Sequence, residues 1–99
     1  MTETETQEAE TYFAFGDDCV EDCACPAVSA GYSPHKTAFL LEFVEMYDDI
    51  VRDEIGTSFG LVPQSMAKNA WMRTISIYET DHPQIARSGK QVADQLGWL

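Results

Sequence analysis

Three cysteines and one histidine in the first third of the chain are the residues best suited to bind a metal. Cys19, Cys23 and Cys25 form the pattern C-x3-C-x-C, and His35 follows in the next segment. Three thiolates and one imidazole can complete a tetrahedral zinc site, which would stabilise a turn-rich segment. The pattern lacks the C-x2-C pairs of common zinc sites, and the carboxylates within residues 17–22 disfavour thiolates. Zinc binding and three reduced thiols beside a surface histidine both stay open.

The chain shows no arrangement of residues typical of catalysis. It contains neither a glycine-rich phosphate loop nor a nucleophile elbow, and no serine or cysteine can be assigned to His82 as a nucleophile. Carboxylates are abundant, but no pair stands out as an acid and a base. A chain of 99 residues also rarely encloses a deep pocket. The sequence therefore predicts a protein that is not an enzyme and that, zinc apart, needs no cofactor.

Negative charge is concentrated in the first half of the chain. The 99 residues include 17 Asp and Glu against 6 Lys and Arg, a formal net charge of −11. Residues 1–55 carry 14 acids and 2 bases, whereas residues 56–99 carry 3 acids and 4 bases. The first half would repel DNA, so only the second half could face it. An acidic surface favours basic protein partners or imitation of a phosphate backbone.

Composition divides the chain into an acidic, cysteine-containing arm at residues 1–32 and a helical domain at residues 33–99. Residues 12–15 are a short aromatic segment that predicts either a strand or an anchor for the arm. No apolar stretch approaches the roughly 18 residues of a membrane span, and the acidic N-terminus is unlike a secretory signal. These features predict a cytoplasmic protein without a membrane partner.

The first helix of the domain is predicted to start at Ser33, which suits an N-cap, with Pro34 in the first helical position. Apolar residues then recur at helical spacing. They are Phe39, Leu40, Phe43, Val44, Met46, Tyr47, Ile50 and Val51. The opposite face is predicted to carry Glu42, Glu45, Asp48 and Asp49.

Two further helices are predicted in the middle of the chain. A short one covers residues 53–59 and is closed by Gly60, and a longer one runs from Pro63 toward Tyr78. Residues 74–78 also alternate like a strand, but the helical pattern continues into them from the preceding turn.

The last helix is predicted to begin at Asp81-His82-Pro83 and to stop at Gly97, after which Trp98 and Leu99 fold back onto the core. The predicted fold class is therefore all-α. It is a small orthogonal helical bundle that contains a helix-turn-helix and follows an irregular acidic arm.

The helix-turn-helix interpretation rests on residues 52–71. Gly56 is a small residue where two helices would touch, and Gly60 can take the positive φ of a tight turn. The apolar residues around them are Ile55, Phe59, Leu61 and Met66. In this pattern, residues 36–75 resemble small helix-turn-helix proteins of the repressor and phage-regulator kind. Val62 departs from the usual Ser or Thr cap, and Asn69 from an aliphatic core position.

The resemblance implies that the helix starting at Pro63 enters the major groove of double-stranded DNA. Its base-contacting residues would be Gln64, Ser65, Lys68 and Asn69. Its phosphate contacts would come from Arg73, together with Arg87 and Lys90. So few bases imply weak binding by one chain, and hence a homodimer.

Two functions follow from the sequence. The first is a small regulatory protein that reads DNA through its helix-turn-helix. The second is an acidic helical interaction module, such as an inhibitor, an adaptor or a nucleic-acid mimic, that binds a basic partner surface without touching DNA. The joint placement of the glycines and apolar residues in the helix-turn-helix segment favours the first.

Overall fold

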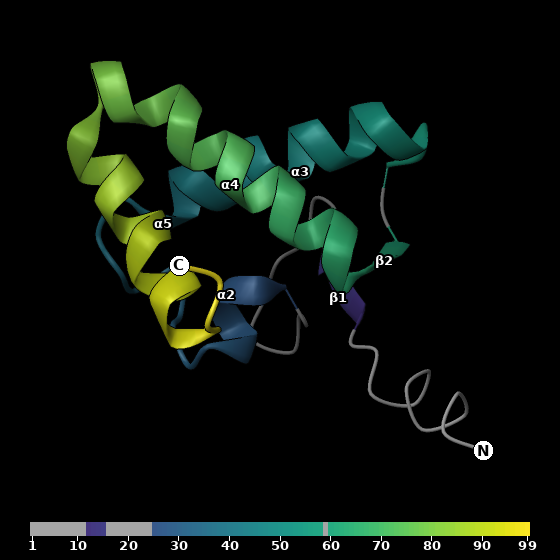
Figure 1. The fold of residues 1–99 in the computed structure, drawn as a ribbon, viewed down its shortest axis with the longest axis horizontal. Helices are drawn as coiled ribbons and strands as arrows, with labels where there is room; N and C mark the ends of the chain where they lie inside the picture. The colour runs from purple at the N-terminus through teal and green to yellow at the C-terminus, as the bar shows by residue number, and fades with distance from the viewer. Residues whose placement is uncertain (1–11, 16–24, 59) are drawn as a thin grey trace.

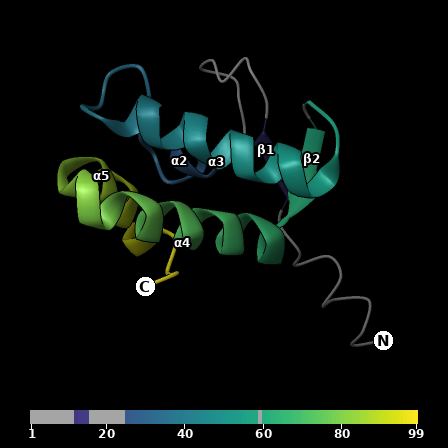
Figure 2. The same ribbon diagram turned by 90° about the horizontal axis from the view of Figure 1, so that it is seen from above.

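The computed structural model describes residues 12–15, 25–58 and 60–99, and this part of the chain is mostly helical (Figure 1). Its elements in chain order are β1 (Tyr12–Phe15), α2 (Pro26–Ser29), α3 (Leu40–Ile55), β2 (Gly60–Pro63), α4 (Gln64–Asp81) and α5 (Pro83–Gln95). Helices α3 and α4 lie side by side, and α5 turns back from the end of α4 (Figure 2). The helices therefore enclose one core, to which the strands add.

The core is built around Trp71 of α4, which is fully buried. Its ring lies 4.6 Å from that of Phe43 and 5.0 Å from that of Tyr47, both on α3. The indole Nε1 of Trp71 donates a hydrogen bond to the carbonyl of Gly89 on α5, at 2.9 Å. Trp71 therefore joins all three long helices.

The expectation of an all-α fold is confirmed only in part: the described residues are mostly helical, but they include a two-stranded antiparallel sheet. Strand β1 pairs with β2, with Phe13 opposite Val62. Side chains alternate across a sheet, so these two face inward and are buried, whereas Tyr12 and Leu61 face outward and are exposed. The aromatic segment of the predicted arm is thus a strand of the core.

Helix α3 begins later than the sequence predicts. Ser33 does not cap it: the amides of Lys36 and Thr37 donate to the Ser33 carbonyl and close an isolated turn. Phe39 then adopts φ 69°, a left-handed conformation that interrupts helical geometry, and α3 starts at Leu40. The first stripe residue, Phe39, is consequently exposed rather than in the core.

The predicted short helix at residues 53–59 is also wrong for its described part. Residues 53–55 are the last turn of α3, which ends at Gly56 in a left-handed conformation with φ 88°. A Cβ on Gly56 would meet no atom within 4 Å, so this glycine ends a helix rather than permitting two helices to touch. Gly60 does take a positive φ, 152°, but within β2. Phe59 lies outside the described residues.

The second half of the chain follows the sequence more closely. Residues 74–78 are helical within α4, α5 begins at Pro83, and Gly97 has φ 77° just after it. Trp98 is buried and packs edge-on against Phe13 of β1, as the fold-back predicts, whereas Leu99 is exposed.

Candidate interaction surface

Four exposed carboxylates follow one another along the outer face of α3. We call this set the acidic ridge: Glu42, Glu45, Asp49 and Asp53. Their spacings of three and four residues place them on one side of the helix, opposite the apolar residues that face the core. The ridge spans about 16 Å at the usual rise per residue. It is therefore a line of negative charge on a rigid support.

Asp48, which the sequence places on the polar face with Glu45 and Asp49, is instead buried. It lies within one turn of Val44 and Val51, at the border of the apolar stripe, and packing of α3 covers it. Asp48 therefore does not belong to the ridge.

Among the described residues, the charge of the ridge is only partly compensated. Arg52, the one basic residue in the sequence of α3, donates a hydrogen bond to the Asp49 carboxylate in an exposed ion pair. Burial, followed in size by the negative charges of Glu42, Glu45 and Asp49, raises the pKa of Tyr78 on α4. The field of the ridge thus reaches the neighbouring helix.

The raised pKa of Tyr78 predicts a loss of stability at alkaline pH. An unfolded tyrosine titrates at about pH 10. Above that pH the folded chain retains a phenolic proton that the unfolded chain has lost. The contribution of Tyr78 to the free energy of unfolding is therefore complete below about pH 10 and falls as the pH rises through the folded pKa. Glu42→Gln should lower the pKa of Tyr78 in a titration followed by ultraviolet absorbance or NMR. Asp94→Asn, on α5, should leave it unchanged; equal shifts would contradict the assignment.

A groove of about 320 Å³ opens between α3 and the first turns of α4. Its apolar residues are Ile50, Val51, Met66 and Ala70, and its polar residues are Glu54, Ser65, Asn69 and Arg73. Arg73 reaches back across the groove to the Glu54 carboxylate, with 3.2 Å between nitrogen and oxygen. The groove therefore combines an apolar floor with an ion pair at its rim.

The predicted DNA-contacting residues share the outward side of α4. Ser65, Lys68, Asn69 and Arg73 are exposed, and Gln64 is half-buried. Three of them line the groove: Ser65 and Asn69, which are predicted to contact bases, and Arg73, which is predicted to contact phosphate. The helix thus brings these side chains together.

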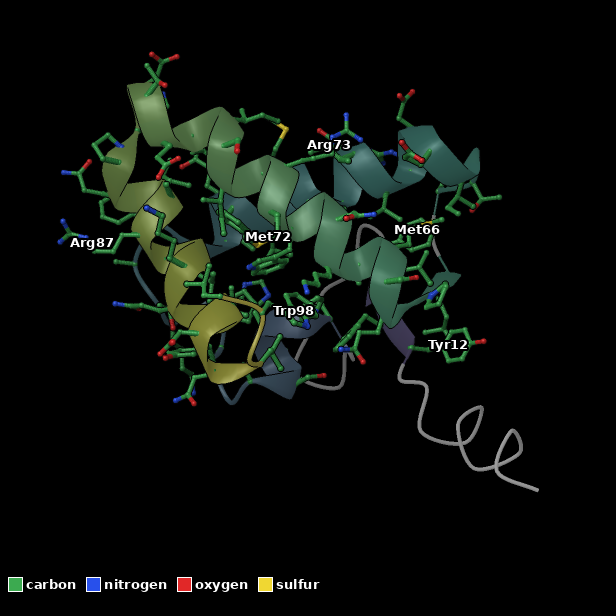
Figure 3. All side chains as sticks on the ribbon, viewed as in Figure 1. Tyr12, Met66, Met72, Arg73, Arg87 and Trp98 are labelled. Atoms are coloured by element: carbon green, nitrogen blue, oxygen red, sulfur yellow. The ribbon has the colours of Figure 1, made fainter. Side chains whose placement is uncertain are left out.

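The basic residues predicted to contact phosphates do not share one helix: Arg73 is on α4, and Arg87 and Lys90 are on α5. Besides the pair of Arg73 with Glu54, Lys90 contacts Glu79 at 2.7 Å. Arg87 is exposed on α5, at the opposite end of the view from Met66 (Figure 3). Two of the three cations are thus engaged with carboxylates of the same chain.

The predicted zinc ligands are described only in part. Cys19 and Cys23 lie outside the described residues. Cys25 is buried in the core next to α2, whereas His35 is exposed in the turn before α3. Within residues 12–15, 25–58 and 60–99 no three His, Cys, Asp or Glu side chains form a group that could hold a metal ion. The zinc site stays a prediction.

Comparisons of the chain with protein-family models, curated proteins and solved structures returned no match. In the part of the chain that the structure describes, no helix has both the length and the apolar character needed to cross a membrane.

Proposed function

We propose that the protein is an acidic helical interaction module that binds a basic surface of a partner protein through the outer face of α3. The observation that carries this proposal is the acidic ridge. Its four carboxylates are exposed on a helix whose opposite face is buried in the core. A partner with lysines or arginines at matching intervals would be attracted and oriented by it.

Repulsion within the ridge supports this role. Glu45 and Asp49, and then Asp49 and Asp53, are like charges four residues apart, an arrangement that costs an isolated helix about 0.2–0.5 kcal/mol per pair. A bound cation relieves that repulsion and adds its own attraction. The electrostatic energy of the ridge is thus more favourable in a complex than in the isolated chain.

Sequence-specific DNA binding through α4 is the second candidate, and the exposure of Ser65, Lys68, Asn69 and Arg73 favours it. Phosphates that approach Ser65, Asn69 and Arg73 would, however, meet the exposed carboxylate of Glu54 in the same groove. Because phosphate neutralisation supplies most non-specific affinity, this arrangement offers DNA little attraction. The acidic module is therefore the preferred function.

The test is a titration of the full chain with a labelled, alanine-based helical peptide of about 12 residues whose arginines follow the spacing of the ridge. A random-sequence DNA duplex is titrated in parallel, first at low salt and then at about 150 mM. The double variant Glu42→Gln, Glu45→Gln should weaken peptide binding at least about fivefold. Its matched control is Asp81→Asn, Asp94→Asn, which removes the same charge from exposed positions outside the ridge.

Equal peptide affinities for the two double variants would contradict the ridge as the binding surface. Tighter binding of the duplex than of the peptide, lost in Lys68→Ala, would instead establish the DNA-binding candidate.

A further inference from the structure

We propose that the groove between α3 and α4 receives one lysine or arginine side chain of the basic partner, which replaces Arg73 as the cation paired with Glu54. This inference rests on the proposed function and assigns a specific subsite to it.

The shape and composition of the groove fit a long basic side chain. Ligand pockets for small molecules begin at about 300 Å³, and the groove, at about 320 Å³, is at that lower limit. Ile50, Met66 and Ala70 offer apolar surface to a methylene stem, and the Glu54 carboxylate lies at the rim. Lysine and arginine bury their stems in this way while they keep the charged group at a polar edge.

The electrostatics of this end of α3 also favour a cation. Glu54 lies in the last turn of α3, which ends at Gly56, and the C-terminal end of a helix carries a partial negative charge. Asp53 precedes Glu54 by one residue, so their side chains point about 100° apart around the helix, and the groove lies around the C-terminal end of α3 from the acidic ridge. A partner on the ridge can therefore insert a side chain into the groove if it extends around the C-terminal end of α3.

Arg73 already shows that the site accepts a guanidinium. Its nitrogen lies 3.2 Å from the Glu54 oxygen, and the two side chains are 60% and 51% exposed. An ion pair so exposed is weak, because water and salt screen it. A cation from a partner can displace Arg73 at little cost, and its aliphatic stem can then cover the apolar floor.

The experiment compares three single variants with the arginine-containing peptide described above. Glu54→Gln should weaken binding about fivefold, because the partner cation loses its carboxylate. Arg73→Gln should tighten binding about threefold more than Lys68→Gln does. Lys68 is the matched control, since it is a cation on the exposed side of the same helix that does not line the groove. Circular dichroism verifies that each variant is folded.

A peptide scan identifies the inserted residue. Each arginine of the peptide is replaced in turn by norleucine, which keeps an apolar stem but removes the charge. One replacement should weaken binding to the natural chain yet have little further effect in Glu54→Gln, whereas the others should weaken both alike.

The results separate this subsite from the proposed function. Equal effects of Arg73→Gln and Lys68→Gln, with no peptide position coupled to Glu54, would overturn the groove as the binding site of the partner's side chain. In that case, loss of binding on neutralising Glu42 and Glu45 would still support the ridge as the binding surface. Absence of peptide binding at low salt would overturn both. Weaker duplex binding in Arg73→Gln, where the peptide should bind more tightly, would assign the groove to DNA.

Discussion

Replacement of Gly89 by alanine is expected to lower the free energy of unfolding by about 2–3 kcal/mol, a large share of the total for a domain of this size. Helix α5 passes so close to α3 here that a Cβ on Gly89 would overlap the ring of Phe43. That ring is fully buried and is held between Trp71 and Tyr78, so it has little room to move. Thermal denaturation should show a melting temperature lower by about 10 °C or more.

The cause of this loss can be tested by making room. Phe43→Leu shortens the side chain that the new methyl group would meet, at a cost of its own. If overlap with the ring is responsible, Gly89→Ala should cost at least about 1 kcal/mol less in the Phe43→Leu background. Additive effects of the two changes would show that alanine at position 89 destabilises the fold for another reason.

Replacement of Trp71 by phenylalanine is expected to cost about 2–3 kcal/mol. The change removes the indole N–H that donates to the Gly89 carbonyl, and it leaves unfilled volume among Phe43, Tyr47 and Trp98. Because Trp71 contacts both other long helices, the loss should appear in a single cooperative transition during urea denaturation.

Trp98→Phe is the matched control, since it makes the same change at a second buried tryptophan. The Nε1 atom of Trp98 has no hydrogen-bond acceptor among the described residues. Removal of a buried donor without a partner recovers its desolvation cost, so we expect a net loss of no more than about 1 kcal/mol. Equal losses for the two variants would mean that the bond to Gly89 contributes little.

Local patterns in the sequence were sufficient to predict the last two helices. Proline at position 83, glycine at position 97 and apolar residues at helical spacing predict α4 and α5 correctly. Each of these signals acts within a few residues of the element it specifies. The sequence also predicted that Trp98 folds back, because a large apolar side chain after a helix stop requires cover.

The errors arose where distant segments decide the local structure. Strand β1 pairs with β2, which lies in the second half of the chain. No residue near positions 12–15 therefore indicates whether that segment is a strand or an anchor. Ser33 and Pro34 have the residue types of a helix start, yet the left-handed Phe39 delays the helix to Leu40. The Oγ of Ser88 on α5 donates to the Ala38 carbonyl at 3.1 Å, which fixes this segment from a remote part of the chain.

The candidate site was predictable to a similar extent. The spacing of Ser65, Asn69 and Arg73 already puts them on one side of a helix. Their neighbour Glu54 was one acid among 17, and no local signal distinguished it from the others. Only the packing of α3 against α4 brings it to Arg73 and creates the groove.

The pairing of β1 with β2 has a consequence for the order in which the chain folds. Helices α4 and α5 are joined at His82 and need only a short loop to meet, whereas the two strands must close a loop that contains α2 and α3. Closure of a long loop loses more chain entropy, so we expect the strands to pair last and to separate first. Since β2 runs directly into α4, the Met66 end of the groove would loosen before the α4–α5 pair opens.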